Sequence, residues 1–245
     1  MRCPRIYSPQ ALSSNTTLTL AADASHHLAK VLRMQSGAEL VLFNGDGGEY
    51  PATITAIDKR SVSVATGQLT ESVLESPLQL HLGIAMSKGE RMDWIVQKAT
   101  ELGVTHLTPL ISERVEVRLQ GERAEKKLAH WRGIAIAACE QCGRNRLPLI
   151  EEIQTLSDWL QTTDADAKFV LHHRAAVPLD NNAPRPASVA LLIGPEGGLS
   201  DSEISAAQRQ QFAPLQLGPR VLRTETAPLA AISVLQFLWG DLQDR

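Results

Sequence analysis

Two glycine-rich loops contain the residues of this sequence that are best suited to bind a small ligand. The first, Gly194-Pro-Glu-Gly-Gly198, follows an apolar run and precedes the start of a helix. The second, residues 217–227, holds a glycine, a proline, two arginines, two threonines and a glutamate. Glycine lets the backbone approach a ligand closely, and a strand–loop–helix layout often binds a phosphate. The residue types of both loops therefore indicate ligand binding.

The glutamate of the first loop argues against a phosphate ligand. Neither loop matches the G-x-x-x-x-G-K-S/T or the G-x-G-x-x-G pattern, and Glu196 would repel a triphosphate. A neutral or cationic ligand suits the loop better, because the carboxylate could face a positive centre or accept from a ribose hydroxyl. Taken alone, residues 194–198 could also be only a tight turn between a strand and a helix. The second loop favours a binding site, since ordinary connections have about 4–6 residues.

No residue spacing predicts a metal site or a covalent nucleophile. Cys139 and Cys142 form a C-x-x-C near the end of a long apolar helix, without a second such pair. No G-x-S-x-G and no clear Cys–His pair occurs in the sequence. The two cysteines are therefore expected to pack rather than to bind a metal.

The first part of the chain, up to about residue 76, predicts a small β domain. A helix is expected at 25–33, where Leu28, Val31 and Leu32 fall on one face. Short strands are expected at 39–43, 49–57 and 61–64. Short strands around one helix favour a small barrel.

From residue 78 onward, strands alternate with helices, which predicts an α/β domain with a mostly parallel sheet. Ser200 and Glu203 predict a capping box at the start of one helix, and the four tryptophans fall in helical patterns that suggest core positions. Ligands of such sheets bind beyond the carboxyl ends of strands, where both glycine loops fall. The expected strands are 78–85, 105–111, 149–153, 168–172, 189–193 and 215–217, and the expected helices are 90–102, 121–142, 200–211 and 226–239.

Composition and charge narrow the class of protein. The chain has 245 residues with 43% hydrophobic and 21% charged residues, which is typical of a globular protein. The formal charge of −3 argues against general polyelectrolyte binding, although residues 111–150 hold eight basic against five acidic residues. No stretch approaches the ~20 apolar residues of a membrane helix, and no secretory signal is recognisable. With three cysteines that fit reduced thiols, we expect a cytoplasmic protein without membrane contact.

Together, the two loops resemble the paired signature of the SPOUT methyltransferases, which contain a trefoil knot. Within this superfamily, the sequence is similar to the RsmE family of 16S rRNA uridine N3-methyltransferases. Three further segments carry the resemblance, which extends over nearly the whole chain: residues 26–33, residues 87–92 with 97–103, and residues 137–146.

The resemblance implies a trefoil-knotted α/β methyltransferase domain at 75–245, preceded by a PUA-like β-barrel that binds RNA at 1–74. It also implies S-adenosylmethionine as cofactor, 16S rRNA or the 30S subunit as partner, no metal, and a homodimer. Valine at Gly194 or Gly218 should abolish cofactor binding by crowding. Cofactor contacts are expected from Leu171, His172, Gly194, Pro195, Glu196, Gly198, Leu199, Leu217, Gly218, Val221, Leu222, Thr224 and Ala227.

The chemistry implied by the resemblance assigns catalytic roles to the second loop. Methyl transfer to a uracil nitrogen requires close positioning of donor and acceptor, and removal of the N3 proton. Arg223 is expected to orient the uracil or to stabilise its developing charge. Arg220 would serve the same end, and Glu225 is the nearest candidate base. Either arginine could instead hold the loop together through Glu225.

RNA contacts are expected from arginines of both domains, because arginine pairs bidentately with phosphate. A solvated surface position is the alternative for any single one of them. Two other functions remain open: methylation of a ribose 2′-hydroxyl, and a non-catalytic role as an rRNA-binding assembly factor. The predicted RNA-binding residues are Arg5, Arg33, Arg114, Arg118, Arg144 and Arg146.

Overall fold

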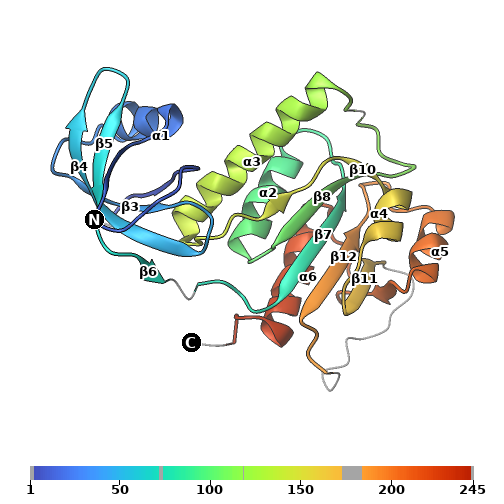
Figure 1. Ribbon diagram of the computed structural model, residues 1–245. Coiled ribbons are helices and arrows are strands. Elements are labelled where there is room, and N and C mark those ends of the chain that lie inside the picture. Colours follow the sequence, from blue (N-terminus) through green and yellow to red (C-terminus); the bar gives the residue numbers. More distant parts are fainter. Residues whose placement is uncertain (1–2, 72–73, 118, 173–183, 244–245) are drawn as a thin grey trace. The chain divides into compact units, whose positions relative to one another are not determined.

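The computed structural model describes residues 3–71, 74–117, 119–172 and 184–243 (Figure 1). Contacts divide the chain into two compact units, residues 1–75 with 136–147, and residues 76–135 with 148–245. Helix α3 (Glu122–Cys142) contributes its first part to the second unit and its last part to the first. The predicted domains, 1–74 and 75–245, stay a prediction, because the units are defined by contacts and not by independent folding.

The first unit contains a six-stranded sheet in the described part of the chain, with the order β1-β3-β4-β5-β2 and with β6 paired to β4. β1 and β3 run parallel, and the other pairs are antiparallel. Alternating side chains of these strands form a core with Leu28 of the helical segment. The strands are β1 (Arg5–Tyr7), β2 (Thr17–Thr19), β3 (Glu39–Phe43), β4 (Gly48–Ile57), β5 (Val62–Thr66) and β6 (Thr70–Glu71).

The helical segment of this unit differs from the prediction. Helix α1 (Ala22–His26) continues into a π-helical turn, η1 (His27–Val31). Leu28 is fully buried, whereas Val31 and Leu32 are 59% and 41% exposed. The N–H of Leu32 donates to the carbonyl oxygen of His27 at 2.9 Å, an i→i+5 bond that widens the turn. Of the predicted apolar face, Leu28 is therefore buried, whereas Val31 and Leu32 are not.

The second unit confirms the predicted α/β class. Its described residues form a seven-stranded sheet with the order β10-β8-β7-β12-β11-β13, with β9 paired to β8. All of these pairs are parallel, so the carboxyl ends of the strands meet at one edge. The expected trefoil knot stays a prediction. The strands are β7 (Gln79–Ala85), β8 (His106–Ile111), β9 (Leu149–Ile150), β10 (Gln154–Thr155), β11 (Ala167–Leu171), β12 (Ser188–Ile193) and β13 (Ala213–Leu215).

Both faces of this sheet are covered by helices (Figure 1). Leu191 and Ile193 of β12 pack in one core with α2, α3 and α6, whereas Ala190 and Leu192 pack in the other with α4 and α5. This alternation explains why β12 is apolar throughout. The helices besides α3 are α2 (Arg91–Glu101), α4 (Leu156–Thr162), α5 (Asp201–Arg209) and α6 (Thr226–Trp239).

The tryptophans only partly follow the prediction. Trp131, Trp159 and Trp239 are buried, but Trp94 on α2 is 50% exposed, so its predicted core position is wrong. Lys98, one helical turn away, lies 5.1 Å from the Trp94 ring centre. Within the described ranges, no helix combines the length and the apolar character needed to cross a lipid bilayer.

Candidate active site

A cavity of about 730 Å³ lies in the second unit, at the carboxyl ends of β11, β12 and β13. Its walls are the loop between β12 and α5 and the loop between β13 and α6. Every residue predicted for cofactor contact or catalysis lines this cavity. The lining also includes residues without a predicted role in cofactor binding, namely Arg91, Arg114, Ile193, Gly197, Asp201, Ile204, Leu215 and Gln216.

The first loop is a tight, capped turn as well as a cavity wall. The N–H of Gly198 donates to the carbonyl oxygen of Pro195 at 2.8 Å, and Gly198 has a φ of 69°. The Ser200 hydroxyl accepts from the N–H of Glu203, whose carboxylate accepts from the N–H of Ser200 at 2.8 Å. This confirms the predicted capping box. The loop is therefore a capped turn that borders a cavity, and its contact with a ligand stays a prediction.

Gly194 cannot carry a side chain without a shift of its neighbours. A Cβ atom at this position would lie 2.9 Å from Cγ of Leu199 and 3.0 Å from its backbone nitrogen. Gly218 of the second loop differs, because a Cβ atom there would have no heavy atom within 4 Å in the described structure. Its φ of 70° disfavours a side chain instead. The expectation of crowding is thus supported at Gly194 and corrected at Gly218.

Glu196, the charged residue of the first loop, is paired within the protein. Its Oε1 lies 2.6 Å from Nη1 of Arg91 at the start of α2. Burial raises the pKa of Glu196, but hydrogen bonds from backbone groups and from Arg91 outweigh burial, so the pKa is lowered overall. The carboxylate is charged at neutral pH, and Arg91 already compensates its charge. The ligand therefore need not be cationic to tolerate this glutamate.

The segment that follows β8 holds the first loop from another side. Nη1 of Arg114 donates to the carbonyl oxygen of Gly197 at 2.8 Å. The N–H of Glu113 donates to Oε1 of Glu203 at 2.7 Å. Arg114, predicted as an RNA contact, is thus placed at the wall of the cavity, and its RNA contact stays a prediction.

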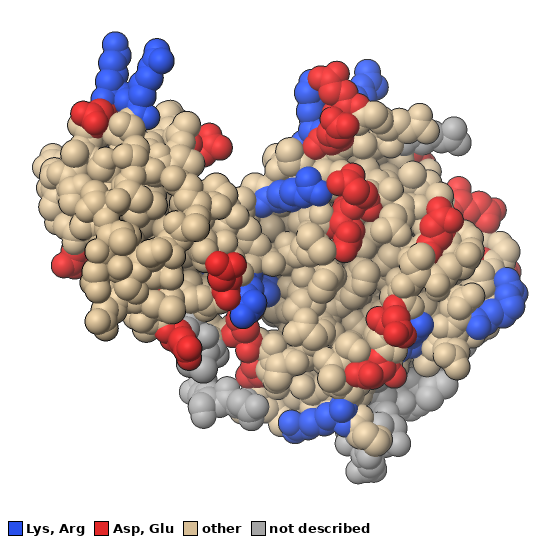
Figure 2. Space-filling view, viewed as in Figure 1, with Lys and Arg blue, Asp and Glu red and all other residues tan. Residues whose placement is uncertain are grey.

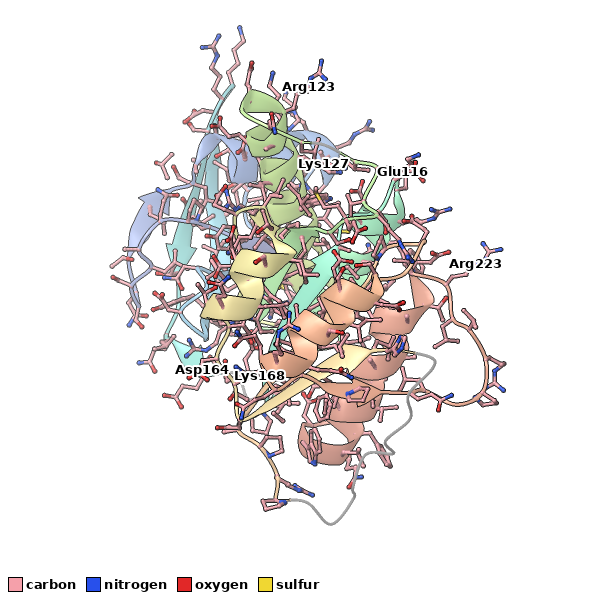
Figure 3. All side chains as sticks on the ribbon, turned by 90° about the vertical axis from the view of Figure 1, so that its right-hand side faces the viewer. Glu116, Arg123, Lys127, Asp164, Lys168 and Arg223 are labelled. Atoms are coloured by element: carbon pink, nitrogen blue, oxygen red, sulfur yellow. The ribbon has the colours of Figure 1, made fainter. Side chains whose placement is uncertain are left out.

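The second loop carries the predicted catalytic residues. Arg223 has a side chain that is 85% exposed, and Figure 3 shows it directed away from the body of the protein. Its Nη1 lies 3.9 Å from Oε1 of Glu225, whose side chain is 26% exposed. Arg220 is exposed and lines the same cavity. The long Arg223–Glu225 contact leaves the guanidinium accessible to a substrate.

Two of the predicted RNA-binding arginines, both in the first unit, are largely enclosed by protein. Nη1 of Arg5 lies 2.6 Å from Oε2 of Glu49, and Nη2 donates to the carbonyl oxygen of Gly143 at 3.1 Å. Arg144 is 5% exposed and donates through Nε and Nη2 to Oε2 of Glu75, at 3.1 and 3.0 Å. These contacts favour a structural role for Arg5 and Arg144.

The remaining predicted RNA contacts are at the surface or outside the described residues. Arg33 is exposed, with a φ of 51°. Arg146 is also exposed, and its guanidinium covers Gly47 in the turn before β4. Arg118 lies outside the described residues. Basic and acidic side chains are interspersed on the face of each unit shown in Figure 2, so RNA contacts would have to be local.

Cys139 of the C-x-x-C pair is enclosed by the protein. Among the described residues, no group of three His, Cys, Asp or Glu side chains could hold a metal ion. Cys139 is fully buried, and burial raises the pKa of its thiol to about 12. This thiol stays protonated, which fits the expected packing role.

Comparison with known proteins identifies the class. The family described as "RNA methyltransferase domain" matches residues 74–236, and the family described as "RNA methyltransferase PUA domain" matches residues 20–66. The cavity at the carboxyl edge of the parallel sheet is the ligand position expected for an α/β enzyme. The fold and the site therefore define an RNA methyltransferase.

Full-length relatives identify the family. Ribosomal RNA small subunit methyltransferase E of Buchnera aphidicola (Schizaphis graminum) is 38% identical, with 98% of each chain covered, and that of Bacillus subtilis is 30% identical, with 93% of each covered. The same enzyme of Neisseria gonorrhoeae, solved with S-adenosylmethionine bound, has 37% identity and a TM-score of 0.91, covering 98% of this chain and 100% of that one. A Legionella pneumophila protein, solved with the same cofactor, has 44% identity and a TM-score of 0.94, covering 99% and 100%. The chain belongs to the ribosomal RNA small subunit methyltransferase E family, which confirms the resemblance.

Proposed function

We propose that this protein transfers a methyl group from S-adenosylmethionine to N3 of a uridine in the 16S rRNA of the small ribosomal subunit. The observation that carries the proposal is the cavity, which brings every predicted cofactor and catalytic residue to one site. The names of the relatives and the cofactor held by two related structures support the same function.

The residues of the cavity fit the cofactor. A volume of about 730 Å³ lies within the roughly 300–1,000 Å³ of small-molecule sites. Leu199, Leu217 and Leu222 supply apolar walls, and Gly194 and Gly218 border the cavity. When bound, S-adenosylmethionine supplies a methyl group already activated on a sulfonium.

Residues of the second loop then act on the acceptor base. The uracil N3 proton must leave, and we assign its acceptance to the carboxylate of Glu225, which lines the cavity. Negative charge then spreads to the uracil carbonyl oxygens, where the exposed guanidinium of Arg223 stabilises it. Arg220 acts on the same charge. The target base must be unpaired or turned out of its helix for N3 to be reached.

Substrate binding and assembly complete the proposal. The PUA match at residues 20–66 supports RNA binding by the first unit, with Arg33 and Arg146 as its exposed contacts. The proposal includes a homodimer, as the family resemblance implies. Action on ribosomal RNA carries with it a cytoplasmic location.

The test is an in vitro assay with labelled S-adenosylmethionine, comparing naked 16S rRNA with 30S particles that lack the modification. Fragmentation of product nucleosides by mass spectrometry locates the methyl group. We expect 3-methyluridine. A methyl group on the ribose would support the 2′-hydroxyl alternative, and no transfer to either substrate would support the assembly factor.

A further inference from the structure

Arg91 connects the two loops of the cavity, although it belongs to neither. It is the first residue of α2 and lines the cavity itself. Its Nη1 lies 2.6 Å from Oε1 of Glu196 in the first loop, and its Nε lies 3.8 Å from Oε2 of Glu225 in the second. One guanidinium thus faces a carboxylate from each loop.

The position of Arg91 opposes local helix preferences. A positive charge at the N-terminus of a helix is unfavourable, because the helix dipole is positive there. The N-cap residue, Glu90, makes no side-chain capping hydrogen bond that would offset this. Partly exposed ion pairs also stabilise a fold only weakly, and Arg91 and Glu196 are 46% and 41% exposed. Stability alone does not explain an arginine at this place.

The charges around Arg91 alternate in sign. Along the cavity wall, they run Glu196, Arg91, Glu225 and Arg223. Glu225 therefore has one oxygen toward Arg91, at 3.8 Å, and the other toward Arg223, at 3.9 Å. The guanidinium fork can serve two carboxylates at once, whereas the point charge of lysine can serve only one at close range.

We propose that Arg91 is a positioning residue that binds Glu196 and Glu225 and thereby holds the acceptor loop in register with the cofactor loop. This inference rests on the proposed function. Arg91 acts through Glu225 and makes no contact with the substrate. Losing it weakens the hold on the cofactor loop only modestly, because the pair with Glu196 is partly exposed, but it misplaces the carboxylate that accepts the proton. Misplacement of a reacting group by about 1 Å lowers a rate by up to about a hundredfold.

The first test separates cofactor binding from methyl transfer in Arg91→Met. Calorimetry gives the affinity for S-adenosylmethionine, and single-turnover incorporation of labelled methyl gives the transfer rate at saturating cofactor. We expect affinity to fall by roughly fivefold at most, because the pair with Glu196 is partly exposed. The transfer rate at saturating cofactor should fall by tenfold to about a hundredfold. The matched control is Arg132→Met, which removes a similarly exposed arginine, paired to Glu152 at 3.1 Å outside the cavity. Its affinity and rate should both stay unchanged.

The second test asks whether Arg91 acts through Glu225. If it does, Arg91→Met/Glu225→Gln is no slower than Glu225→Gln alone. A further rate loss in the double variant would overturn the proposal, since Arg91 would then act on the substrate itself. An unchanged rate in Arg91→Met, or a loss confined to cofactor affinity, would also overturn it.

Arg91→Lys provides a second variant that keeps the proposal testable if Arg91→Met fails to fold. It keeps the charge but not the fork, so we expect a transfer rate between those of Arg91→Met and the unaltered protein, and no effect in the Glu225→Gln background. If Arg91→Lys transferred methyl at the full rate, the proposal that Arg91 must contact Glu196 and Glu225 at the same time would be wrong. The labelled methyl group is counted on whichever acceptor atom receives it. A methyl group found on an atom other than uridine N3 would therefore reject the proposed function. The same assay would still measure the coupling of Arg91 to Glu225.

Discussion

Arg114 donates from Nη1 to the carbonyl oxygen of Gly197 at 2.8 Å, so a side chain that follows β8 fixes the loop that follows β12. A hydrogen bond from a charged donor contributes about 1.5–3 kcal/mol when enclosed, and less here because Arg114 is exposed. We expect Arg114→Met to weaken S-adenosylmethionine binding by roughly fivefold, measured by calorimetry. Arg209→Met, at an exposed position on α5, is the control. Equal affinities in both variants would contradict this role.

The glycines of the two loops should respond differently to alanine. Gly194→Ala places a Cβ atom 2.9 Å from Leu199, so the wall must shift, and cofactor affinity should fall by more than about tenfold. Gly218→Ala meets open space but adopts a φ of 70°, at a cost of about 1–2 kcal/mol. The loss of cofactor affinity in Gly218→Ala should therefore be smaller than that in Gly194→Ala.

Gly133→Ala is the control for both substitutions. Gly133 lies within α3, and a Cβ atom there meets no heavy atom within 4 Å among the described residues. Alanine should therefore leave cofactor affinity unchanged and stabilise the helix by up to about 1 kcal/mol. A loss of binding in this variant would mean that the assay reports general stability rather than loop geometry.

The parts of the fold and the site that could be predicted are those encoded by neighbouring residues in the sequence. An apolar strand that ends in glycine, and a serine three positions before a glutamate, determine the loop and the capping box around Ser200 without reference to distant residues. The contacts of Arg91 and Arg114 depend instead on which strands are neighbours in the sheet. No local pattern encodes that order, so both residues had no predicted role at the cavity.

Other differences also come from tertiary context. The π-turn after α1 exposes Val31 and Leu32 although their spacing is helical. Helix α4 had no predicted bounds, although Trp159 was expected in a helical pattern and in the core. This side chain fills the space beside Gly83, where a Cβ atom would lie 2.5 Å from the indole.

Arg223→Ala tests the catalytic role of the second loop. The side chain is 85% exposed, so its loss should not disturb the fold or the cofactor walls. The rate of methyl transfer should fall by about 10²-fold if the guanidinium stabilises charge on the uracil. Single-turnover incorporation measures the rate, and calorimetry checks that cofactor affinity is intact. A normal rate with normal affinity would remove Arg223 from the mechanism.

His81 should make the stability of the second unit depend on pH. Burial, with a smaller contribution from His106, lowers the pKa of His81 from 6.5 to about 4. Between these values the unfolded chain binds more protons than the folded one, so stability falls as the pH falls from 6.5 to about 4, by at most about 3 kcal/mol. Below pH 4, this contribution has been lost completely.

Urea unfolding at pH 7 and pH 4.5 measures the dependence. His81→Asn should reduce the difference between the two pH values, whatever it does to stability at pH 7. His26→Asn, at an exposed position, should retain the full difference. An undiminished difference in His81→Asn would assign the effect to other groups.

Glu75 should be important for the stability of the first unit. Its carboxylate accepts from Arg144, from the N–H of Asn145 at 3.2 Å and from the N–H of Arg146 at 3.0 Å. Removal of one partner from an enclosed ion pair destabilises a protein by about 3–5 kcal/mol. We expect Glu75→Ala to approach that range in urea unfolding. Glu152→Ala, which loses an exposed pair with Arg132, should cost about 1 kcal/mol or less.

The position of β12 between β7 and β11 has a consequence for how the protein is made. Ser188 pairs with Gln79, and Ile193 with Ile84, so the central strand of the sheet leaves the ribosome long after the strand it joins. Until β12 has been made, β7 lacks a partner along one edge. The pairing of β7 with β12 joins segments far apart in the sequence, and such pairing is slow. Both cavity loops are synthesised later still. A growing chain therefore gains its cofactor site only in the last stage of synthesis, and an interrupted product cannot compete for the cofactor.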